Sequence, residues 1–506
     1  MLSSSTSPDL RARVALFTLL AAAVFTRFYQ LGAESFWLDE AITFVRSRMP
    51  MPALIENSLS HFHNPAYFML IHEWMAFGDS EAMLRAPSAI AGVLKVLAVY
   101  VAGTIAVDRR VGLFAGAFIT LCPVQLRYDQ EARMYAPLSL GFAVALCGML
   151  WMVRNAEAAW VPFSKPVAPH DDKLTRRKAV GAWLAFVLGC VLALYMHNTA
   201  VLAVTGFSLA VLPALIFRAP GFRRLFLAWT TANIVVVSAF AIWLPKLLEQ
   251  SDTLSKRGYS ARPIELGHVL AALRDTFVFG SLSDVLSVAV AVVLAAGVWS
   301  LRKERFVLGA IGIAALSAPL LFGVASLHDP MFSSRLLSWG AIPCALLGGA
   351  GLAALRLPRA EKLAAPAFIV LCAFVLHTKY YEASVKQCWR EALQTIAAST
   401  RPSPYDKSSR TYFLAVSAHY LSTYYFERAH QPIRPFRIAA VDRVVKRLDK
   451  DLKRATDVWV LRSPTQSASD ELLLTRLERD WHVVETRTFE QHTELHRYAM
   501  NDAERP

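Results

Sequence analysis

Apolar runs long enough to cross a lipid bilayer recur along most of this 506-residue sequence. A spanning helix needs about 17–25 mostly apolar residues, because hydrocarbon offers no water to satisfy free backbone groups. The composition agrees, since 55% of the residues are hydrophobic and 18% are charged, against about 25% charged in soluble domains. We therefore expect a polytopic all-α membrane bundle of about eleven helices, the third and last being short enough to be tilted or re-entrant. The runs lie near 13–31, 85–107, 111–126, 134–153, 180–196, 199–217, 225–245, 284–301, 306–326, 336–355 and 363–378.

The basic residues indicate how the helices are oriented. The chain has 53 Lys and Arg against 39 Asp and Glu, a net charge of +14. With the N-terminus inside, the short inside connections are rich in Lys and Arg, whereas the short outside connections hold only Arg127, Arg133 and Arg335. This asymmetry follows the positive-inside rule and explains the basic balance without nucleic acid. We expect a multi-pass protein of the plasma (bacterial inner) membrane with a cytoplasmic N-terminus. The predicted outer loops are 32–84, 127–133, 246–283 and 328–335.

The charge density changes after the last apolar run. Residues 379–506 contain 38 charged residues out of 128, whereas the preceding 378 residues contain 54. We therefore predict two domains: a transmembrane domain at 1–378 and a soluble extracytoplasmic α/β domain at 379–506. The six cysteines form no disulfide framework and no Cys-x-x-Cys metal pair. Predicted strands are Tyr412–Ser417, Ile438–Val441, Val458–Leu461 and His482–Thr488, and predicted helices are His419–Ala429 and Val441–Leu452.

Two adjacent carboxylates, Asp39 and Glu40, follow the first apolar run at the expected outer mouth of the bundle. They could be solvated charges at the interface, which is the usual state of exposed acids. They could also supply a base, because partial burial beside the membrane raises a carboxyl pKa towards the working pH. The sequence alone gives these two interpretations about equal weight.

A second polar cluster joins the third and fourth runs and contains Asp129, Glu131, Arg133 and Tyr135. The simple interpretation is an exposed turn with self-neutralising ion pairs. The Asp129-x-Glu131 pair also resembles part of a divalent-metal site, but two carboxylates are too few to specify a metal. Arg133 could point into an outer cavity.

Further polar residues lie beside the apolar runs. His61 and His63 at i, i+2 fit hydrogen-bonding roles better than a metal site, because no third ligand is evident. Arg85 could be an interfacial anchor. Arg335 departs from the positive-inside pattern, and its planar guanidinium suits a phosphate. Lys95 lies near mid-membrane, where an ionisable residue is a functional candidate, but we assign it to a structural pair outside the site.

These clusters, in this order on this topology, resemble the GT-C-fold glycosyltransferases of the protein O-mannosyltransferase and aminoarabinose transferase type, which use polyprenyl-phosphate-linked sugars. The resemblance covers most of the chain, and it departs from the family pattern at Ala66, Leu336 and Cys388, where the family often has Pro, Tyr and Asp. The matching segments are Asp39-Glu40, His63-Asn64-Pro65-Ala66-Tyr67, Arg85-Ala86-Pro87-Ser88, Gln130-Glu131-Ala132-Arg133-Met134-Tyr135-Ala136, Phe332-Ser333-Ser334-Arg335 and Cys388-Trp389-Arg390-Glu391-Ala392.

The resemblance implies an inverting membrane glycosyltransferase that moves a hexose or pentose to an acceptor lipid, glycan or protein. Asp39 would be the general base, and Glu40 and Glu131 would orient the base or the sugar. His63 and Tyr67 would line the acceptor side. Arg133, Arg335 and Arg85 would bind the leaving phosphate beside Tyr135. No cofactor is required; a divalent cation, if present, would bind Asp129 and Glu131.

Other functions fit parts of the sequence. A polymer ligase with a lipid-diphosphate donor would depend on the outer arginines but not on Asp39. A lipid or solute transporter would favour internal repeats and mid-membrane polar residues, whereas here no repeat is evident and the polar clusters lie at the outer mouth. A scaffold that uses the outer domain to bind partners is also compatible with the sequence.

Overall fold

The computed structural model describes most of the chain and divides it into two compact units. The first unit comprises Met1–Leu31, Pro52–Leu70 and Arg85–Glu382, and the second comprises Gly32–Met51, Ile71–Leu84 and Ala383–Pro506. Each unit is described by itself below. The described residues are 8–160, 173–257, 265–280, 282–326, 332–355, 361–382, 386, 388–399, 411–414, 421, 424–425, 434–435, 457–462, 474–475, 477–489 and 493–500.

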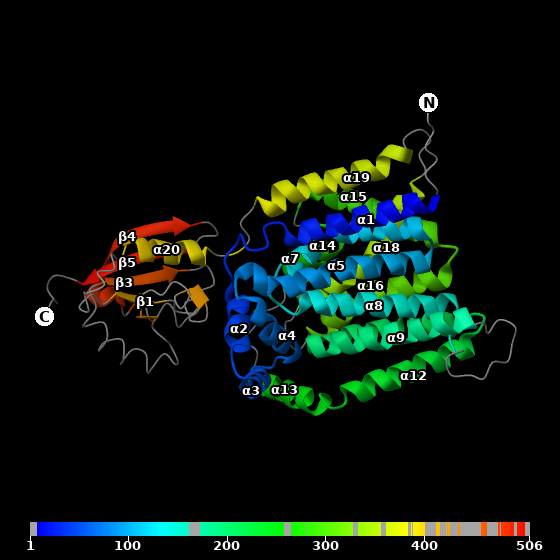
Figure 1. The fold of residues 1–506 in the computed structure, drawn as a ribbon, viewed down its shortest axis with the longest axis horizontal. Helices are drawn as coiled ribbons and strands as arrows, with labels where there is room; N and C mark the ends of the chain where they lie inside the picture. The colour runs from blue at the N-terminus through cyan, green and yellow to red at the C-terminus, as the bar shows by residue number, and fades with distance from the viewer. Residues whose placement is uncertain are drawn as a thin grey trace. The chain divides into compact units, whose positions relative to one another are not determined.

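The first unit is a bundle of helices, many of which run side by side (Figure 1). Helix α4 (Ala66–Trp74) ends in the second unit, and helix α5 (Glu81–Ala106) begins in it. The α-helices of this part of the chain are α1 (Pro8–Phe28), α3 (Met51–Ser60), α4 (Ala66–Trp74), α5 (Glu81–Ala106), α6 (Arg109–Thr120), α7 (Pro123–Asp129), α8 (Tyr135–Arg154), α9 (Lys173–Met196), α10 (Ala200–Leu209), α11 (Leu212–Ile216), α12 (Phe222–Phe240), α13 (Leu244–Arg257), α14 (Leu266–Val278), α15 (Asp284–Leu301), α16 (Arg305–Ala325), α17 (Ser334–Leu337), α18 (Ala341–Ala354) and α19 (Glu361–Leu376).

Six of the described helices are long and apolar enough to cross a membrane, or up to eight if each bent pair is one span. All eleven predicted runs contain helix, but several are short or broken, so the structure does not establish eleven crossings. The third run is one of the bent pairs: α6 and α7 meet at 66° beside Pro123. Proline removes a backbone donor and stops a helix from continuing, and the bend directs the chain into the Asp129–Arg133 turn.

Small residues let the bundle helices pack closely. A side-chain carbon at Gly148 of α8 would collide with the carbonyl of Ala182 in α9, and one at Gly351 of α18 would collide with the carbonyl of Val293 in α15. Glycine is enriched at such contacts because helix association in lipid depends on close van der Waals packing. These contacts hold α8 against α9 and α18 against α15.

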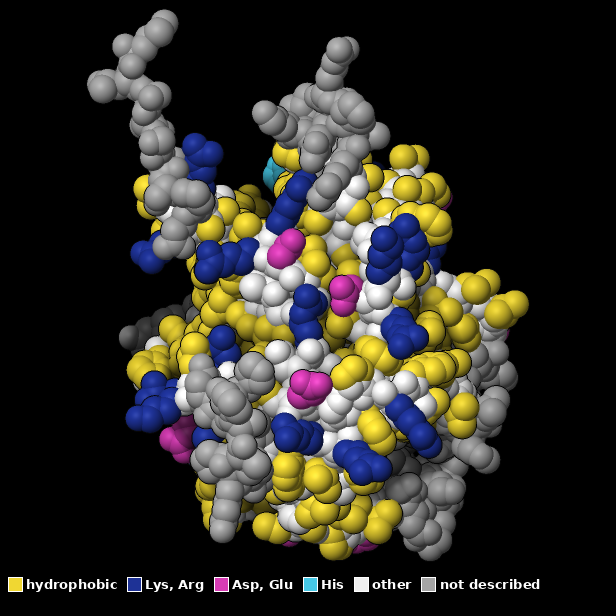
Figure 2. Space-filling view, turned by 90° about the vertical axis from the view of Figure 1, so that its right-hand side faces the viewer, with side chains coloured by type: hydrophobic (Ala, Val, Ile, Leu, Met, Phe, Trp, Pro, Cys, Tyr) yellow, Lys and Arg dark blue, Asp and Glu magenta, His cyan; other side chains and the backbone are white. Residues whose placement is uncertain are grey.

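One end of the first unit is basic. Figure 2 shows Lys and Arg spread over this end with few Asp and Glu. The sequence places Arg109 at the start of α6, Arg154 at the end of α8, Arg302 directly after α15, and Arg305 at the start of α16. The turns after α7, α9 and α16 belong to the opposite helix ends.

The second unit contains α2 (Leu38–Ser47), α20 (Trp389–Ser399) and a five-stranded sheet in the order β2-β1-β3-β5-β4. Strands β1 and β2 are parallel, as are β1 and β3, whereas β5 is antiparallel to both β3 and β4. Both faces of its β3 and β5 strands hold buried side chains: Val458, Val460 and Tyr498 on one face, and Trp459 and Leu495 on the other. The strands are β1 (Thr411–Leu414), β2 (Arg434–Pro435), β3 (Asp457–Arg462), β4 (Trp481–Phe489) and β5 (Thr493–Met500).

The predicted class, a helical membrane bundle with a small C-terminal α/β part, is confirmed. Predicted strands near 412, 458 and 482 correspond to β1, β3 and β4, whereas β5 was not predicted from the sequence. The predicted elements Ile438–Val441 and Val441–Leu452, and most of His419–Ala429, lie outside the described residues. The predicted domain boundary at 378/379 stays a prediction; the contact-defined second unit includes parts of the first loop.

Candidate active site

A buried charge cluster anchors the turn that carries the acidic and basic candidates. Asp129, at the end of α7, accepts a hydrogen bond from Lys95 Nζ at 2.6 Å through Oδ1 and from Arg27 Nε at 3.1 Å through Oδ2. All three side chains are almost fully buried. Charges in an apolar interior must be paired, because each uncompensated one costs several kcal/mol. Asp129 therefore joins α7 to α1 and α5, and the structural pairing expected for Lys95 is present.

The carbonyl groups near the α6–α7 bend add to this anchor. Arg27 Nη1 donates to the carbonyl of Thr120 at 2.8 Å, and Nη2 donates to that of Ile119 at 3.2 Å. Lys95 Nζ also donates to the side chain of Gln125 in α7. Helix carbonyls at a C-terminus lack intrahelical partners, so the guanidinium satisfies them where the span breaks.

Glu131 and Arg133 are both buried in the turn that follows α7, with exposed fractions of 1% and 4%. Glu131 Oε1 lies 3.6 Å from Arg127 Nε. The carbonyl of Arg133 accepts a hydrogen bond from Ser88 Oγ at 3.0 Å, and Ser88 Oγ lies 2.9 Å from the hydroxyl of Tyr67. Tyr67 and Ser88 thus hold the backbone of the turn, and Tyr67 is fully buried.

Tyr135 is the first residue of α8, and its ring lies near side chains from α7, from the turn after α7 and from the turn after α9. Its ring lies 5.2 Å from the ring of Tyr128 and 5.8 Å from that of His197, centroid to centroid. The guanidinium carbon of Arg133 lies 6.0 Å from the same Tyr135 ring, at the limit of a cation–π contact. Arg133 and Tyr135, predicted from the sequence, are therefore close to each other.

His197 follows α9 and was missed by the sequence analysis. Its Nδ1 accepts hydrogen bonds from the backbone N–H of Thr199 at 3.1 Å and from the Thr199 hydroxyl at 2.8 Å. Burial lowers the pKa of His197 to about 3, and the positive charges of Arg133 and Arg335 add to this effect. The only sequence signal was a polar His-Asn pair between two apolar runs at the predicted outer side.

Arg335 lies on the short helix α17 and is exposed. The neighbouring Ser334 Oγ lies 3.5 Å from the hydroxyl of Tyr128. The positive charge of Arg335, like that of Arg133, lowers the pKa of His197. The structure thus gathers Glu131, Arg133, Tyr135, His197 and Arg335 at one end of the first unit; we call this set the cationic cluster.

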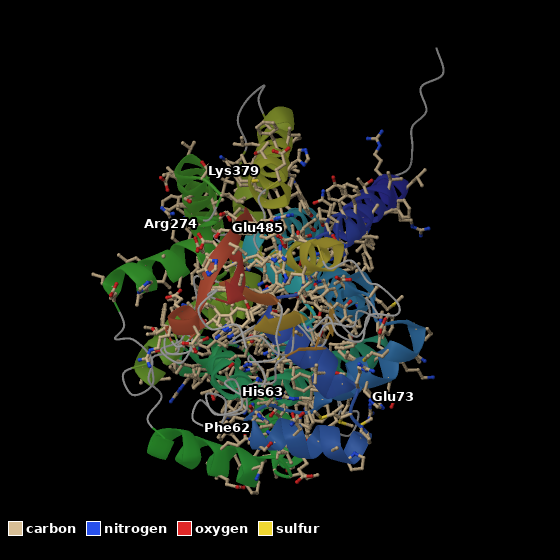
Figure 3. All side chains as sticks on the ribbon, turned by 90° about the vertical axis from the view of Figure 1, so that its left-hand side faces the viewer. Phe62, His63, Glu73, Arg274, Lys379 and Glu485 are labelled. Carbon is tan, nitrogen blue, oxygen red and sulfur yellow. The ribbon has the colours of Figure 1, made fainter. Side chains whose placement is uncertain are left out.

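Two other predicted residues of the first unit have local partners. Arg85 is buried, and its Nη1 donates to the carbonyl of Leu31 at 2.9 Å, which holds the chain after α1. His63 Nδ1 lies 2.6 Å from the carbonyl of His61, and its ring meets that of Phe68 edge-on. Figure 3 shows His63 and Phe62 together, separated in this view from Arg274 and Lys379.

In the second unit, Asp39 and Glu40 lie in the first turn of α2 and differ sharply in environment. Glu40 is fully buried, forms a 3.0 Å ion pair with Lys386 Nζ and caps the helix through the backbone N–H of Trp37. Asp39 is only partly buried. Of the two adjacent carboxylates, Glu40 is thus the one that stabilises the start of α2.

The segment before α2 is held by the start of α20. Arg390 donates hydrogen bonds to the carbonyls of Gly32, Ala33 and Glu34 at 3.0–3.3 Å and pairs with Glu81 at 2.8 Å. Its backbone N–H donates to Ser35 Oγ at 3.0 Å. We call these contacts the Arg390 clamp. The Trp-Arg pair of the sequence thus fixes the chain leading to Asp39.

A metal site at Asp129 and Glu131 is not formed. Both carboxylate oxygens of Asp129 are paired with positively charged side chains, those of Arg27 and Lys95, and Glu131 lies beside Arg127. Among the described residues, no group of three or more His, Cys, Asp or Glu side chains could hold a metal ion.

Comparisons with solved structures place this architecture. ArnT from Cupriavidus metallidurans in the apo state is similar with a TM-score of 0.60 and 14% identity, over 96% of this chain and 98% of that one. The same protein bound to undecaprenyl phosphate is similar with a TM-score of 0.59 and 13% identity, over 97% of this chain and 98% of that one. For an Archaeoglobus fulgidus oligosaccharyltransferase the TM-score is only 0.48 and the identity 13%, over 99% of this chain and 75% of that one.

No protein-family model and no curated protein matches the sequence. The fold is therefore that of a GT-C-type membrane protein with a C-terminal domain, shared with ArnT along nearly the whole of both chains.

Proposed function

We propose that this protein is an integral-membrane glycosyltransferase that transfers a sugar from a polyprenyl-phosphate donor to an acceptor, with inversion at the anomeric carbon. The observation that carries the proposal is the cationic cluster, in which Arg133 and His197 both lie near the ring of Tyr135, and the charges of Arg133 and Arg335 both lower the pKa of His197. Its occurrence on the fold of ArnT, a protein crystallised with undecaprenyl phosphate, supports a lipid phosphate as the ligand.

The cationic cluster suits the leaving group of this reaction. When the glycosidic bond breaks, its electron pair goes to the phosphate oxygen, so negative charge grows on the phosphate. Fixed cations that meet this charge stabilise the transition state more than the ground state. Arg133 and Arg335 would carry this role, and Glu131 would orient the sugar or the arginines. Arg85 acts at least partly through the backbone, since it donates to Leu31.

Asp39 is the proposed general base. It would take the proton of an acceptor hydroxyl or amine, whose oxygen or nitrogen then bonds to the anomeric carbon from the face opposite the phosphate. Glu40 is a poor candidate for this step because its carboxylate is occupied by Lys386 and Trp37. We assign Glu40 a positioning role that acts through the start of α2, in place of the expected role of orienting the base or the sugar directly.

The loop around His63 would form the acceptor side. His63 is partly exposed and could meet an acceptor lipid, glycan or protein, whereas Tyr67 would support the wall through Ser88. The arginines supply counter-charge, so no cofactor is required; addition of a chelator tests whether a divalent cation takes part.

The basic helix ends of Figure 2 support a cytoplasmic placement of that end in a plasma membrane. The cationic cluster, on the opposite helix ends, would then face the extracytoplasmic side. This placement agrees with a donor whose lipid carrier delivers sugar outside the cytoplasm.

A polymer ligase that uses a lipid diphosphate is the main alternative, because the same arginines would suit two phosphates. A transporter is a weaker alternative. The buried charges Lys95 and Arg27 are both paired with Asp129 rather than arranged along a path.

The decisive experiment is sugar transfer by purified protein with polyprenyl-phosphate sugars, comparing wild type with Asp39→Asn and Arg335→Ala. We expect each substitution to lower the rate by about 100–1000-fold, the usual cost of removing a catalytic group or a charge-stabilising donor. Glu56→Gln and Arg302→Ala are matched controls: Glu56 is exposed on α3, and Arg302 lies at the basic end. We expect both controls to retain wild-type rates.

Each outcome has a distinct meaning. Undiminished transfer by Asp39→Asn would remove the proposed base, and dependence on Arg335 alone with a diphosphate donor would favour the ligase. Absence of transfer from every polyprenyl-phosphate sugar would refute the proposed function.

A further inference from the structure

We propose that His197 binds the phosphate of the lipid carrier as a neutral hydrogen-bond donor, through its Nε2–H. The inference rests on the proposed function, because it assigns a third phosphate-binding group to the cationic cluster. No predicted motif contained this residue, and its geometry distinguishes it from a packing histidine.

The hydrogen bonds of His197 define which ring nitrogen carries the proton. The backbone N–H of Thr199 can only donate, and it lies 3.1 Å from Nδ1. Nδ1 must therefore be unprotonated, and the Thr199 hydroxyl at 2.8 Å donates to the same atom. In a neutral imidazole the proton is then on Nε2. Nε2 makes no hydrogen bond to any described residue, so a donor is left available.

The imidazole stays neutral at physiological pH. Burial and the charges of Arg133 and Arg335 keep the pKa of His197 far below its usual value. A third positive charge here would be repelled by the two arginines. A neutral N–H donor adds a directed bond to an anion without that repulsion, and hydrogen bonds to a charged acceptor are stronger than neutral ones.

The turn around His197 is fixed before any ligand arrives. Asn198 Nδ2 donates to the carbonyl of Phe62 at 3.1 Å, and Asn64 Nδ2 donates to the carbonyl of Leu194 at 2.8 Å. Trp243 Nε1 lies 3.4 Å from Asn198 Oδ1. The ring of His197 also rests against Tyr135. A preorganised donor loses little conformational entropy when a ligand binds, which increases the affinity.

Two substitutions separate the two ring nitrogens. Asparagine can place an oxygen near the Nδ1 position and still accept from Thr199, but it has no donor at the Nε2 position. Glutamine can place its amide N–H₂ near Nε2, but it does not replace the Nδ1 acceptor. We expect His197→Asn to weaken binding of undecaprenyl phosphate by about 10- to 100-fold, and His197→Gln to stay within about threefold of wild type.

Binding is measured with undecaprenyl phosphate and, as the probe without phosphate, undecaprenol, on the purified full-length protein in detergent. Only binding of the phosphate should respond to His197→Asn. Thermal unfolding of each variant and of Thr199→Val, which removes one donor to Nδ1, reports the structural role. A purely structural His197 predicts the reverse order, with rescue by Asn and loss with Gln, and that order would overturn the inference.

A second measurement does not depend on whether the variants fold. In wild-type protein labelled with ¹⁵N-histidine, the Nε2 resonance of a histidine whose Nδ1 is unprotonated and hydrogen-bonded, as that of His197 is, should shift on adding undecaprenyl phosphate and not on adding undecaprenol. An unchanged resonance at saturating lipid would overturn the inference. Failure of the proposed function is distinguishable: phosphate binding through His197 without any sugar transfer would refute the transferase but leave the inference standing.

Discussion

At the residue scale, Asp129 was the position where sequence proximity was misleading. The neighbour Glu131 suggested a metal pair, whereas the actual partners, Lys95 and Arg27, are 34 and 102 residues away. Such distances cannot be inferred from one sequence. The physical requirement that mid-membrane charges be paired did predict that Lys95 has a partner, but not which one.

Gly92 allows this cluster to be tested without touching a charge. A methyl group there would lie 2.5 Å from Asp129 Cγ and Oδ2, so Gly92→Ala must displace the carboxylate. We expect destabilisation by about 1–3 kcal/mol, the usual cost of overpacking, measured by thermal unfolding in detergent. Gly181→Ala in α9 is the matched control, because nothing lies within 4 Å of its added carbon.

The control should unfold at or above the wild-type temperature, since Ala is favoured over Gly in a helix by up to about 1 kcal/mol. A Gly92→Ala protein as stable as Gly181→Ala would show that the Asp129 cluster tolerates displacement and does not anchor the turn.

At the scale of elements, α2 and α20 explain why the two adjacent carboxylates have different roles. The first turn of α2 points Glu40 inward to Lys386 and leaves Asp39 partly exposed. Negative side chains are favoured at a helix N-terminus. The sequence predicted both acids at this place, but only the helical geometry separates a capping residue from a candidate base.

The Arg390 clamp predicts a specific effect on the segment before α2. Arg390→Lys keeps the charge but loses the planar fork that reaches three carbonyls and Glu81. We expect faster proteolysis or hydrogen exchange at residues 32–36 and a decrease of transfer of about tenfold, of the order expected for one lost charged hydrogen bond. Arg487→Lys, an exposed arginine beside Glu485, is the control.

The variant should still bind undecaprenyl phosphate like wild type, because the cationic cluster lies in the first unit. Unchanged exchange at residues 32–36 in Arg390→Lys would mean that the clamp does not hold this segment.

At the scale of the whole molecule, the distribution of charge gives a topology that can be measured. Among the six cysteines, Cys388 alone is partly exposed, whereas the other five are buried. We expect a membrane-impermeant maleimide to label Cys388 in intact spheroplasts, because the second unit would be extracytoplasmic. An introduced Arg302→Cys at the basic end should be labelled only after lysis. The opposite pattern would reverse the predicted orientation.

The amino-acid sequence by itself determined the membrane class, the helical bundle, the C-terminal α/β part and the identity of most candidate charges. It could do so because lipid imposes long apolar runs and the sheet imposes short β-rich ones. The sequence did not determine the number of membrane crossings, because a run of apolar residues does not reveal a bend such as that between α6 and α7.

Only the tertiary structure decided which charges act together. It paired Asp129 with Lys95 and Arg27, assigned Glu40 to Lys386, and placed His197 in the environment of Arg133 and Arg335. The physical reason is that the hydrophobicity of each residue is present in the sequence. The energy of a charge or a hydrogen bond depends instead on distance and direction, and those are set by how helices far apart along the chain pack against one another.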